Sequence, residues 1–242
     1  MAIITKEKKR IACYESDFRG KMLPTAAMNY FQEISTYQGD LLEVGGRFLQ
    51  ENQISWFLVK YVIRFMSYPR HKDEVTVTTE ATGMDKFCGT RRFTIEDSKG
   101  EKAVIADTQW LLMNRATQKM ERINNFPEFD AYECFEKGVP LFKKIAKISD
   151  CDLQKTFNVR FLDIDLNKHV NHVKYLAWAI EVLPLEVLKT RVLSEAKIVY
   201  KAQGFYGDQV KAMGEKVDEG HYRVEIVNQE DTLLCQLEIL LD

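Results

Sequence analysis

A short segment in the second half of the chain carries the residue types that could do chemistry. Residues 163–175 read D-I-D-L-N-K-H-V-N-H-V-K-Y, which sets a carboxylate, a carboxamide and an imidazole at alternate positions, Asp165, Asn167 and His169. In an extended segment, residues i, i+2 and i+4 point to one face, so we expect the three side chains to converge. Such a set suits acyl transfer, in which a nucleophile is oriented and an oxyanion is stabilised.

The same segment stands directly before a helical pattern. The free N–H groups at a helix N-terminus favour a developing negative charge, and we expect the amides near Val170 and Asn171 to serve an oxyanion. An alternative interpretation is a polar turn followed by a helix cap, and the spacing alone fits both. His169 and His172 could share a helix face as metal ligands, but no third ligand is evident nearby, so no metal is predicted.

Composition narrows the class of protein. The chain has 242 residues, of which 45% are hydrophobic and 29% charged, and a formal charge of −2, which argues against general nucleic-acid binding. No apolar run approaches the roughly 20 residues of a membrane span, and residues 1–10 lack a signal-peptide core, so we expect a cytoplasmic protein. The five scattered cysteines indicate neither a disulfide framework nor a zinc site, and we expect them to be reduced and mostly buried in the core.

Two stretches show the same order of predicted elements, a strand, a long helix and four antiparallel strands. The first begins at Tyr14 and the second near Lys155. Pro24 fits a first helical turn, and Val-, Thr-, Ile- and aromatic-rich runs favour half-buried strands. The predicted helices span 24–44 and 171–183, and the predicted strands span 56–65, 74–81, 89–96 and 103–113 in the first stretch and 196–201, 209–217, 221–228 and 233–241 in the second.

Weak self-similarity favours an internal duplication, with offsets of about 145 at the helix and about 135 after it. At the 145 offset, Asp165, Asn167 and His169 would correspond to Gly20, Met22 and Pro24, so only one repeat could carry the polar triad. We predict an N-terminal repeat at 1–123, a linker at 124–154 that crosses the surface, and a C-terminal repeat at 155–242. The predicted class is α+β, with each helix wrapped by an antiparallel sheet.

Several segments of the sequence resemble a known protein family. Residues 158–175 resemble the D-x-N-x-H-V-N-N-x-x-Y signature of acyl-acyl carrier protein thioesterases, the plant plastid and bacterial enzymes with a double hotdog fold. Segments 20–33, 68–75, 83–92 and 110–113 also look like that family, so the resemblance covers nearly the whole chain. It implies two tandem hotdog repeats, with the acyl chain held mainly by the first and the catalytic residues in the second.

The resemblance implies roles for the site residues. Asp165 would be a general base for water or a direct nucleophile, His169 would polarise the carbonyl or protonate the thiolate, and Asn167 would orient water or substrate. Asp163 is an alternative carboxylate. One departure is that Gln203 stands where the family has a glutamate, and Gly204 where it often has a cysteine. A catalytic thiol is therefore not expected, and the Gln203 amide could orient a water but not act as a base.

The expected reaction is hydrolysis of fatty acyl-acyl carrier protein thioesters, which ends chain elongation in fatty acid biosynthesis without cofactor or metal. Met28, Phe31 and Trp56 are candidates for holding the acyl chain, although ordinary core packing explains any one of them better. The expected partner is the acidic carrier protein, which would contact either the lysines at 143, 144 and 147 or the basic residues Lys6, Lys8, Lys9 and Arg10. A homodimer is possible. Alternatives are an acyl-coenzyme A thioesterase, a hotdog dehydratase and a non-catalytic acyl-binding protein.

Overall fold

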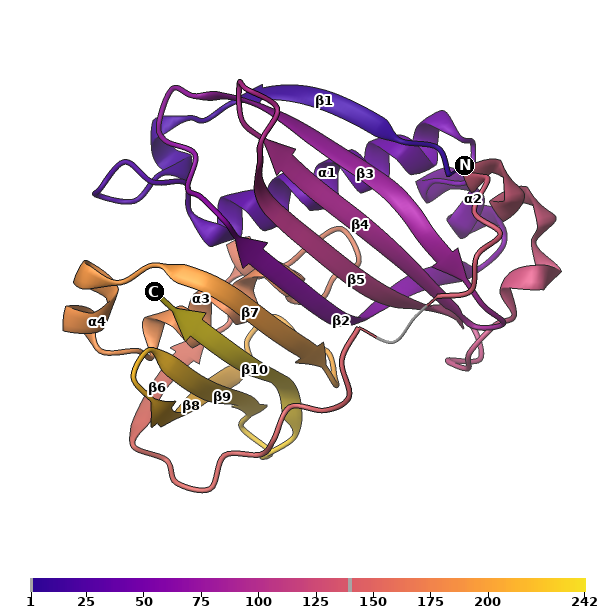
Figure 1. The fold of residues 1–242 in the computed structure, drawn as a ribbon. Helices are drawn as coiled ribbons and strands as arrows, with labels where there is room; N and C mark the ends of the chain where they lie inside the picture. Colours follow the sequence, from indigo (N-terminus) through magenta and orange to yellow (C-terminus); the bar gives the residue numbers. More distant parts are fainter. Residues whose placement is uncertain (1, 139–140) are drawn as a thin grey trace. The chain divides into compact units, whose positions relative to one another are not determined.

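The computed structural model describes residues 2–138 and 141–242, which form two compact units at 1–142 and 143–242. In each unit one long helix lies against an antiparallel sheet (Figure 1). The strand order is β1-β3-β4-β5-β2 in the first unit and β6-β8-β9-β10-β7 in the second, the same topology twice. The predicted α+β class, with two tandem hotdog repeats, is confirmed.

The first unit contains a long helix between its first two strands. Its elements are β1 (Thr5–Arg10), α1 (Pro24–Leu41), α2 (Gly46–Glu51), β2 (Ile54–Phe65), β3 (Glu74–Met84), β4 (Cys88–Glu96) and β5 (Lys102–Asn114). The strand β1 lies ahead of Tyr14, where the sequence pattern places the start of the repeat. Helix α1 ends three residues earlier than predicted because Glu43 takes a left-handed φ of 60° and the Val44 N–H bonds back to the Gly39 carbonyl.

The second unit repeats this plan with a shorter helix. Its elements are β6 (Leu153–Asn158), α3 (His172–Glu181), α4 (Leu185–Thr190), β7 (Leu193–Tyr200), β8 (Gln209–Asp218), β9 (His221–Asn228) and β10 (Leu233–Leu241). The predicted bounds of β9 and β10 are confirmed without change. Helix α3 stops two residues before its predicted end, and Pro184 then begins the connection to α4.

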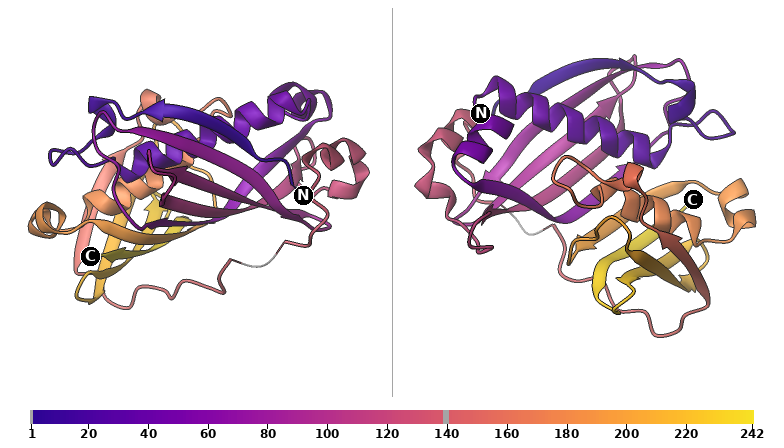
Figure 2. Two further views of the ribbon diagram at one scale, coloured as in Figure 1. Left: turned by 45° about the horizontal axis from the view of Figure 1, so that its top comes forward. Right: turned by 180° about the vertical axis from the view of Figure 1, so that it is seen from behind.

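Helix α1 covers one face of the first sheet (Figure 2). Its apolar residues Ala27, Met28, Phe31 and Ile34 are buried, and Phe31 stacks on Phe93 of β4 with ring centroids 5.0 Å apart. Residues of β3 alternate between buried and half-buried along the strand, as expected for a sheet with one face on a core. Burial of one such phenylalanine stabilises the unit by roughly 1.5–3 kcal/mol, so the helix and sheet hold each other in place.

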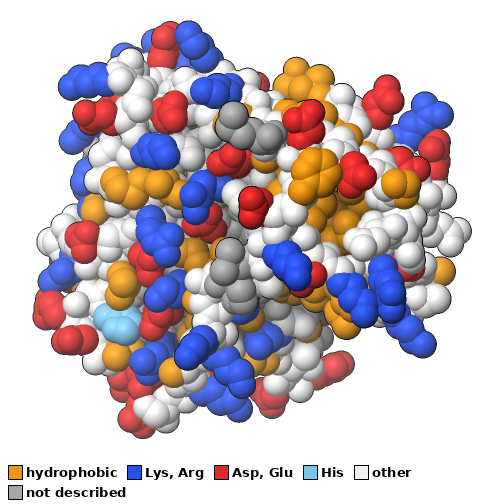
Figure 3. All heavy atoms as spheres, turned by 45° about the vertical axis from the view of Figure 1, so that its right-hand side comes forward, with side chains coloured by type: hydrophobic (Ala, Val, Ile, Leu, Met, Phe, Trp, Pro, Cys, Tyr) orange, Lys and Arg blue, Asp and Glu red, His pale blue; other side chains and the backbone are white. Residues whose placement is uncertain are grey.

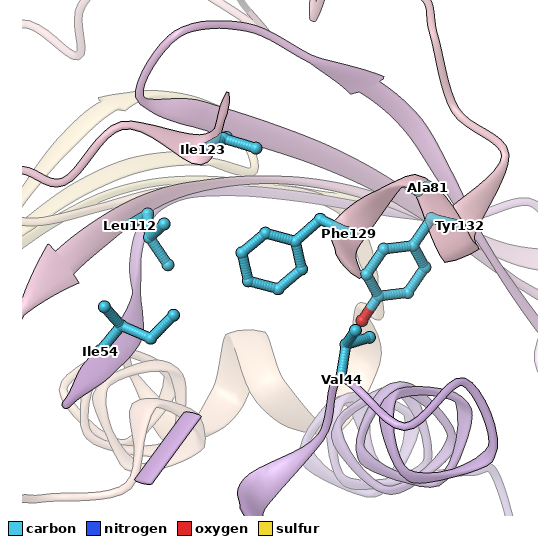
Figure 4. Packing of buried hydrophobic residues seen from close by; sticks show 7 residues of the cluster. All are labelled: Val44, Ile54, Ala81, Leu112, Ile123, Phe129 and Tyr132. Atoms are coloured by element: carbon cyan, nitrogen blue, oxygen red, sulfur yellow. The ribbon is translucent and has the colours of Figure 1, made fainter. Parts of the chain in front are cut away.

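The segment predicted as a surface linker is packed in its first part. Residues Pro127–Tyr132 form a 3-10 helix, and Phe129 and Tyr132 lie buried beside Val44, Ile54 and other core residues (Figure 4). This part of the segment was wrongly expected to cross the surface, because its aromatic spacing follows no helix or strand period. The division into 1–123, 124–154 and 155–242 stays a prediction.

The cysteines differ from the expectation. Cys13 and Cys151 are exposed, Cys88 and Cys134 are half-buried, and Cys235 is buried, so the prediction that most of them are core residues was wrong. All five are free thiols, in agreement with the absence of a pairing pattern. On the face shown in Figure 3, Lys and Arg side chains are interspersed with Asp and Glu side chains. No helix within the described residues is long and apolar enough to cross a membrane.

Candidate active site

The candidate catalytic segment is a tight loop between a 3-10 helix (Phe161–Asp163) and α3. A bridge between Ile164 and Val170 closes the loop. Within it the Asp165 N–H donates to the His169 carbonyl at 2.8 Å, so the chain folds back on itself. The expectation of an extended segment was wrong. Asp165 and His169 are nevertheless neighbours, because they face each other across the mouth of the loop.

The Asp165 carboxylate organises this loop. Its Oδ1 accepts hydrogen bonds from the backbone N–H groups of Asn167 at 2.8 Å and His169 at 3.4 Å. Aspartate commonly closes turns in this way, so the residue holds the loop in addition to any chemistry it performs. Asp165 and His169 are half-buried and Asn167 is exposed, so solvent and a substrate can reach all three.

A second loop, residues 201–208, lies against the first. The Val170 N–H donates to the Gly204 carbonyl at 2.9 Å, and the His169 ring meets the Phe205 ring edge-on with centroids 5.3 Å apart. Gln203 is exposed on this second loop, directly before Gly204. The structure thus brings the loop of Gln203 beside the loop of the other three predicted residues, although 34 positions separate Gln203 from His169.

Gly204 fills a tight position between the two loops. A Cβ atom there would lie 3.1 Å from Val170 Cγ2 and 3.2 Å from the hydroxyl of Tyr175. That hydroxyl accepts a hydrogen bond from the Gly204 N–H at 3.0 Å, and Tyr175 is buried in α3. A side chain at this position would require the side chains of Val170 and Tyr175 to shift by a few tenths of an ångström. Sequence reasoning missed Tyr175 as a contact of this loop.

Asp163 is a structural anchor. Its carboxylate is buried and pairs with Arg160 at 2.9 Å and Lys174 at 3.2 Å. Burial by itself would raise the pKa of Asp163, but hydrogen bonds from Arg160 and Lys174 outweigh it and lower the pKa to about 2. A carboxylate held in this way is a poor proton acceptor near neutral pH. The arrangement therefore disfavours Asp163 as the alternative base.

The backbone donors expected for an oxyanion are already in use. The Val170 N–H bonds to Gly204, and the Asn171 N–H donates to the Asp163 carbonyl at 2.9 Å. The Asn171 side chain caps α3 by accepting from the Val173 N–H at 3.0 Å, as the helix-cap interpretation predicts. The expectation that these two amides serve an oxyanion was wrong. Neither of these two N–H groups is therefore available to a developing negative charge.

His172 is separated in its contacts from His169. Its ring meets Tyr200 of β7 edge-on at 6.2 Å, whereas the His169 ring meets Phe205. Burial lowers the pKa of His172 to about 4, so this imidazole is neutral at physiological pH. Among residues 2–138 and 141–242, no group of three His, Cys, Asp or Glu side chains has the arrangement of a metal site.

The residues predicted to hold an acyl chain belong to the first unit. Met28 and Phe31 are wholly buried on α1, and the Trp56 ring of β2 lies 5.3 Å from that of Phe129. An acyl chain would have to displace this packing to touch them, and their role stays a prediction. A separate surface cleft of about 460 Å³ lies between the β3–β4 turn and residues 122–137, and none of the three lines it.

The first unit contains a twin of the candidate loop. Asp17 Oδ1 accepts from the N–H groups of Arg19 at 2.8 Å and Lys21 at 2.9 Å, and the Asp17 N–H donates to the Lys21 carbonyl at 2.8 Å. These hydrogen bonds match those of Asp165, and they place the repeat offset at 148 here.

The predicted offset of 145 was therefore wrong, and the counterparts of Asp165, Asn167 and His169 are Asp17, Arg19 and Lys21. The offset of about 135 after the helix is supported by two matching aspartates. Asp73 and Asp208 each accept at 2.8 Å from the N–H group three residues before them. The shared spacing D-x-R-x-K and D-x-N-x-H was the signal that could have revealed the register.

The architecture defines a class of protein, tandem hotdog domains in one chain. Solved structures with this fold include a protein from Lactobacillus plantarum that is described as an oleoyl thioesterase. It gives a TM-score of 0.91 and is 24% identical, and the match covers 99% of this chain and 96% of that one. A 12:0-acyl carrier protein thioesterase from Umbellularia californica gives a TM-score of 0.89 with 18% identity over 99% and 97%.

Family models identify the chain more narrowly. The N-terminal domain model of acyl-acyl carrier protein thioesterases matches residues 3–129, and the C-terminal domain model matches residues 146–242. The chain therefore belongs to the acyl-acyl carrier protein thioesterase family.

Curated plant proteins are similar at lower coverage. An acyl-acyl carrier protein hydrolase of Cuphea viscosissima, described as chloroplastic, is 28% identical over 73% of this chain and 46% of its own length. An oleoyl-acyl carrier protein thioesterase of Coriandrum sativum, also described as chloroplastic, is 26% identical over 88% of this chain and 63% of its length. The chain thus spans about half to two thirds of the length of these relatives.

Proposed function

We propose that this chain hydrolyses fatty acyl thioesters of acyl carrier protein and releases a free fatty acid. The observation that carries the proposal is that the family's C-terminal domain model covers the loop in which Asp165, Asn167 and His169 are held together. The first repeat keeps the same loop but has Arg19 and Lys21 in place of the amide and the imidazole. Chemistry is therefore expected once per chain, in the second unit.

The reaction follows from the side chains that this loop presents. A water molecule adds to the thioester carbonyl carbon, the C–S bond breaks, and the carrier's thiolate takes up a proton. Asp165 either removes the proton from that water or attacks the carbonyl itself to form an anhydride that water then cleaves. A thiolate leaves readily, so stabilisation of the oxyanion matters more than protonation of the leaving group.

The oxyanion donors are the side chains near the loop mouth. The amides of Val170 and Asn171 are engaged, and the carboxamides of Asn167 and Gln203 and a ring N–H of His169 are the donors that we propose for the oxyanion. Gln203 is exposed on the neighbouring loop and carries no charge, so its role is to orient water or the thioester.

Several further proposals accompany the proposed function. Acyl carrier protein is the proposed partner, a cytoplasmic location and a homodimer are proposed for the protein, and Met28, Phe31 and Trp56 are proposed to contact the acyl chain. The lysines at 143, 144 and 147 are exposed, as are Lys6, Lys8 and Arg10 of β1, so either group is accessible to an acidic partner.

The test is thiol release from acyl-acyl carrier proteins and from the matching acyl-coenzyme A esters. We expect release from the carrier substrates, and a fall of at least ~100-fold in kcat for Asp165→Asn. Circular dichroism of the variant shows whether the loop change has unfolded the protein. Faster release from the coenzyme A esters would favour an acyl-coenzyme A thioesterase, and binding of acyl groups without thiol release would favour a non-catalytic protein.

A further inference from the structure

The two loops of the candidate site expose apolar side chains. We propose that these side chains, together with Lys168, form the surface on which the acidic acyl carrier protein docks; this rests on the proposed function. The loop-tip patch consists of Phe161, Leu162, Leu166, Phe205 and Tyr206, each at least 50% exposed. Leu166, at the tip of the Asp165–His169 loop, is fully exposed.

The patch is continuous with the candidate catalytic residues. The Phe161 and Tyr206 rings meet edge-on with centroids 6.4 Å apart, which links the 3-10 helix to the second loop. Phe205 in turn contacts the His169 ring. Clusters of exposed apolar side chains on soluble chains mark surfaces that another molecule covers. Because the acyl group is covalently attached to the carrier protein, the carrier must bind close to the residues that cleave the thioester.

Charge favours an acidic partner at this place. Lys168 is exposed, and no carboxylate of the described chain pairs with its ammonium group. It holds a left-handed φ of 66°, and the twin loop has Gly20 there with a φ of 71°. The second repeat thus has the cationic Lys168 in a left-handed backbone conformation that glycine adopts more readily. Arg160, which flanks Phe161 where the twin has Ala12, is already paired with Asp163 at 2.9 Å, so Lys168 is the cation on which the charge argument depends.

The twin loop shows which features are specific to the second repeat. Tyr14 and Phe18 are exposed at the positions of Leu162 and Leu166, so apolar tips belong to both loops. In the first unit, however, Arg19 is bound to Asp17 at 2.9 Å and the Lys21 ammonium lies over the Tyr68 ring. A second copy of the chain seated on the loop-tip patch would block a substrate from Asp165 and His169, whereas a carrier protein seated there brings its own thioester to them, so the carrier is the favoured occupant.

The experiment compares one acyl group on two thiols, acyl carrier protein and free pantetheine. The measured quantity is the ratio of kcat/KM for the carrier thioester to kcat/KM for the pantetheine thioester. We expect Lys168→Glu and Leu166→Ser each to lower this ratio at least ~10-fold, with the effect of Lys168→Glu shrinking as salt is raised. The matched control is Phe18→Ser on the twin loop, for which we expect the wild-type ratio.

The outcomes separate the docking surface from the reaction. Equal losses on both thioesters, or an unchanged ratio in both loop-tip variants, would overturn the docking surface. A change of oligomeric state in Leu166→Ser, seen by light scattering, would assign the patch to self-association and overturn it as well. If the wild-type protein cleaves neither thioester, the proposed function fails, and binding of the carrier protein to wild type and Lys168→Glu, measured by calorimetry, still decides the docking surface.

Discussion

At the scale of single residues, the candidate site depends on how Asp165 and Gly204 are used. One oxygen of the Asp165 carboxylate accepts hydrogen bonds from the backbone of its own loop. These bonds fix the orientation of the carboxylate before any substrate arrives. Gly204 lets the neighbouring loop approach closely enough for its carbonyl to accept from Val170. The close approach of the second loop to the loop of Asp165 thus depends on the small residue Gly204.

Substitution of Gly204 tests this close approach. We expect Gly204→Ala to lower kcat/KM at least ~10-fold and to cost about 1–3 kcal/mol of unfolding free energy, because the added Cβ crowds Val170 and Tyr175. Thioester hydrolysis and denaturant unfolding measure the two effects. Gly46→Ala in α2, where a Cβ meets no atom within 4 Å, is the control and should leave both values near wild type. An active, stable Gly204→Cys variant would contradict the argument.

Asp163 gives a prediction on stability and pH. Its pKa is lowered in the folded chain to about 2 from an ordinary value of 3.8, so it stabilises the fold above pH 4 and this contribution is lost as the pH falls toward 2. Asp163→Asn should therefore cost about 2 kcal/mol of unfolding free energy at pH 7. Urea unfolding at pH 7 and pH 3 measures it. A penalty that stays the same at both pH values would show that the ion pairs are not its cause.

At the scale of elements, helix α3 does more than fill the core of the second unit. Its first residue follows the Asn171 cap, and its Tyr175 reaches the loop of Gly204 with a buried hydroxyl. The chain of contacts runs from Tyr175 through Gly204 and Val170 to His169. An element of the core thereby fixes the distance between two surface loops.

Tyr175 is therefore a positioning residue. We expect Tyr175→Phe to leave KM unchanged and to lower kcat roughly 10- to 100-fold, because the Gly204 N–H loses its acceptor and the loop beside His169 shifts. Steady-state kinetics give the split between kcat and KM.

The control for this variant is Tyr200→Phe, which removes another hydroxyl at the start of α3, one that donates to the His172 carbonyl at 3.2 Å. If both variants lose activity to the same degree, the effect belongs to general packing and not to the loop.

At the scale of the whole molecule, the two repeats share a scaffold and differ in what it carries. The 3-10 helix, the aspartate-closed loop and the returning second loop occur in both units with matching backbone hydrogen bonds. In the first unit, hydrogen bonds from Lys21 and Arg19 outweigh the effect of burial and lower the pKa of Asp17. Both aspartates thus close their loops, and the proposed chemistry belongs to Asp165 alone.

Removal of Asp17 separates these two roles. We expect Asp17→Asn to cost about 1 kcal/mol of unfolding free energy and to leave kcat/KM within about twofold of wild type, because a carboxamide still accepts one backbone hydrogen bond. Thermal unfolding and thiol release measure the two quantities beside Asp165→Asn. A loss of activity as large as that of Asp165→Asn would contradict the assignment of chemistry to the second repeat alone.

The sequence by itself determined the order of elements, the tandem repeat and the residues of the candidate site. Hydrophobic periodicity and turn residues are local properties, so the strands 221–228 and 233–241 could be placed to the residue. The family signature named Asp165, Asn167 and His169 for the same reason, since it is a contiguous pattern, whereas Gln203 was named because it stands where the family has a glutamate. The packing of Phe129 and Tyr132 follows no period, and their burial could not be read from the chain.

Only the tertiary structure decided the conformation and the connections of the site. It showed that Asp165 and His169 meet across a closed loop, that the amides of Val170 and Asn171 are engaged, and that the true counterpart of Asp165 is Asp17. The bond from Val170 to Gly204 joins two loops that are distant in sequence, and it forms only once packing has fixed the backbone. The register of the repeats became visible when the hydrogen bonds of the two loops could be compared, although the shared spacing of D-x-R-x-K and D-x-N-x-H carries it in the sequence.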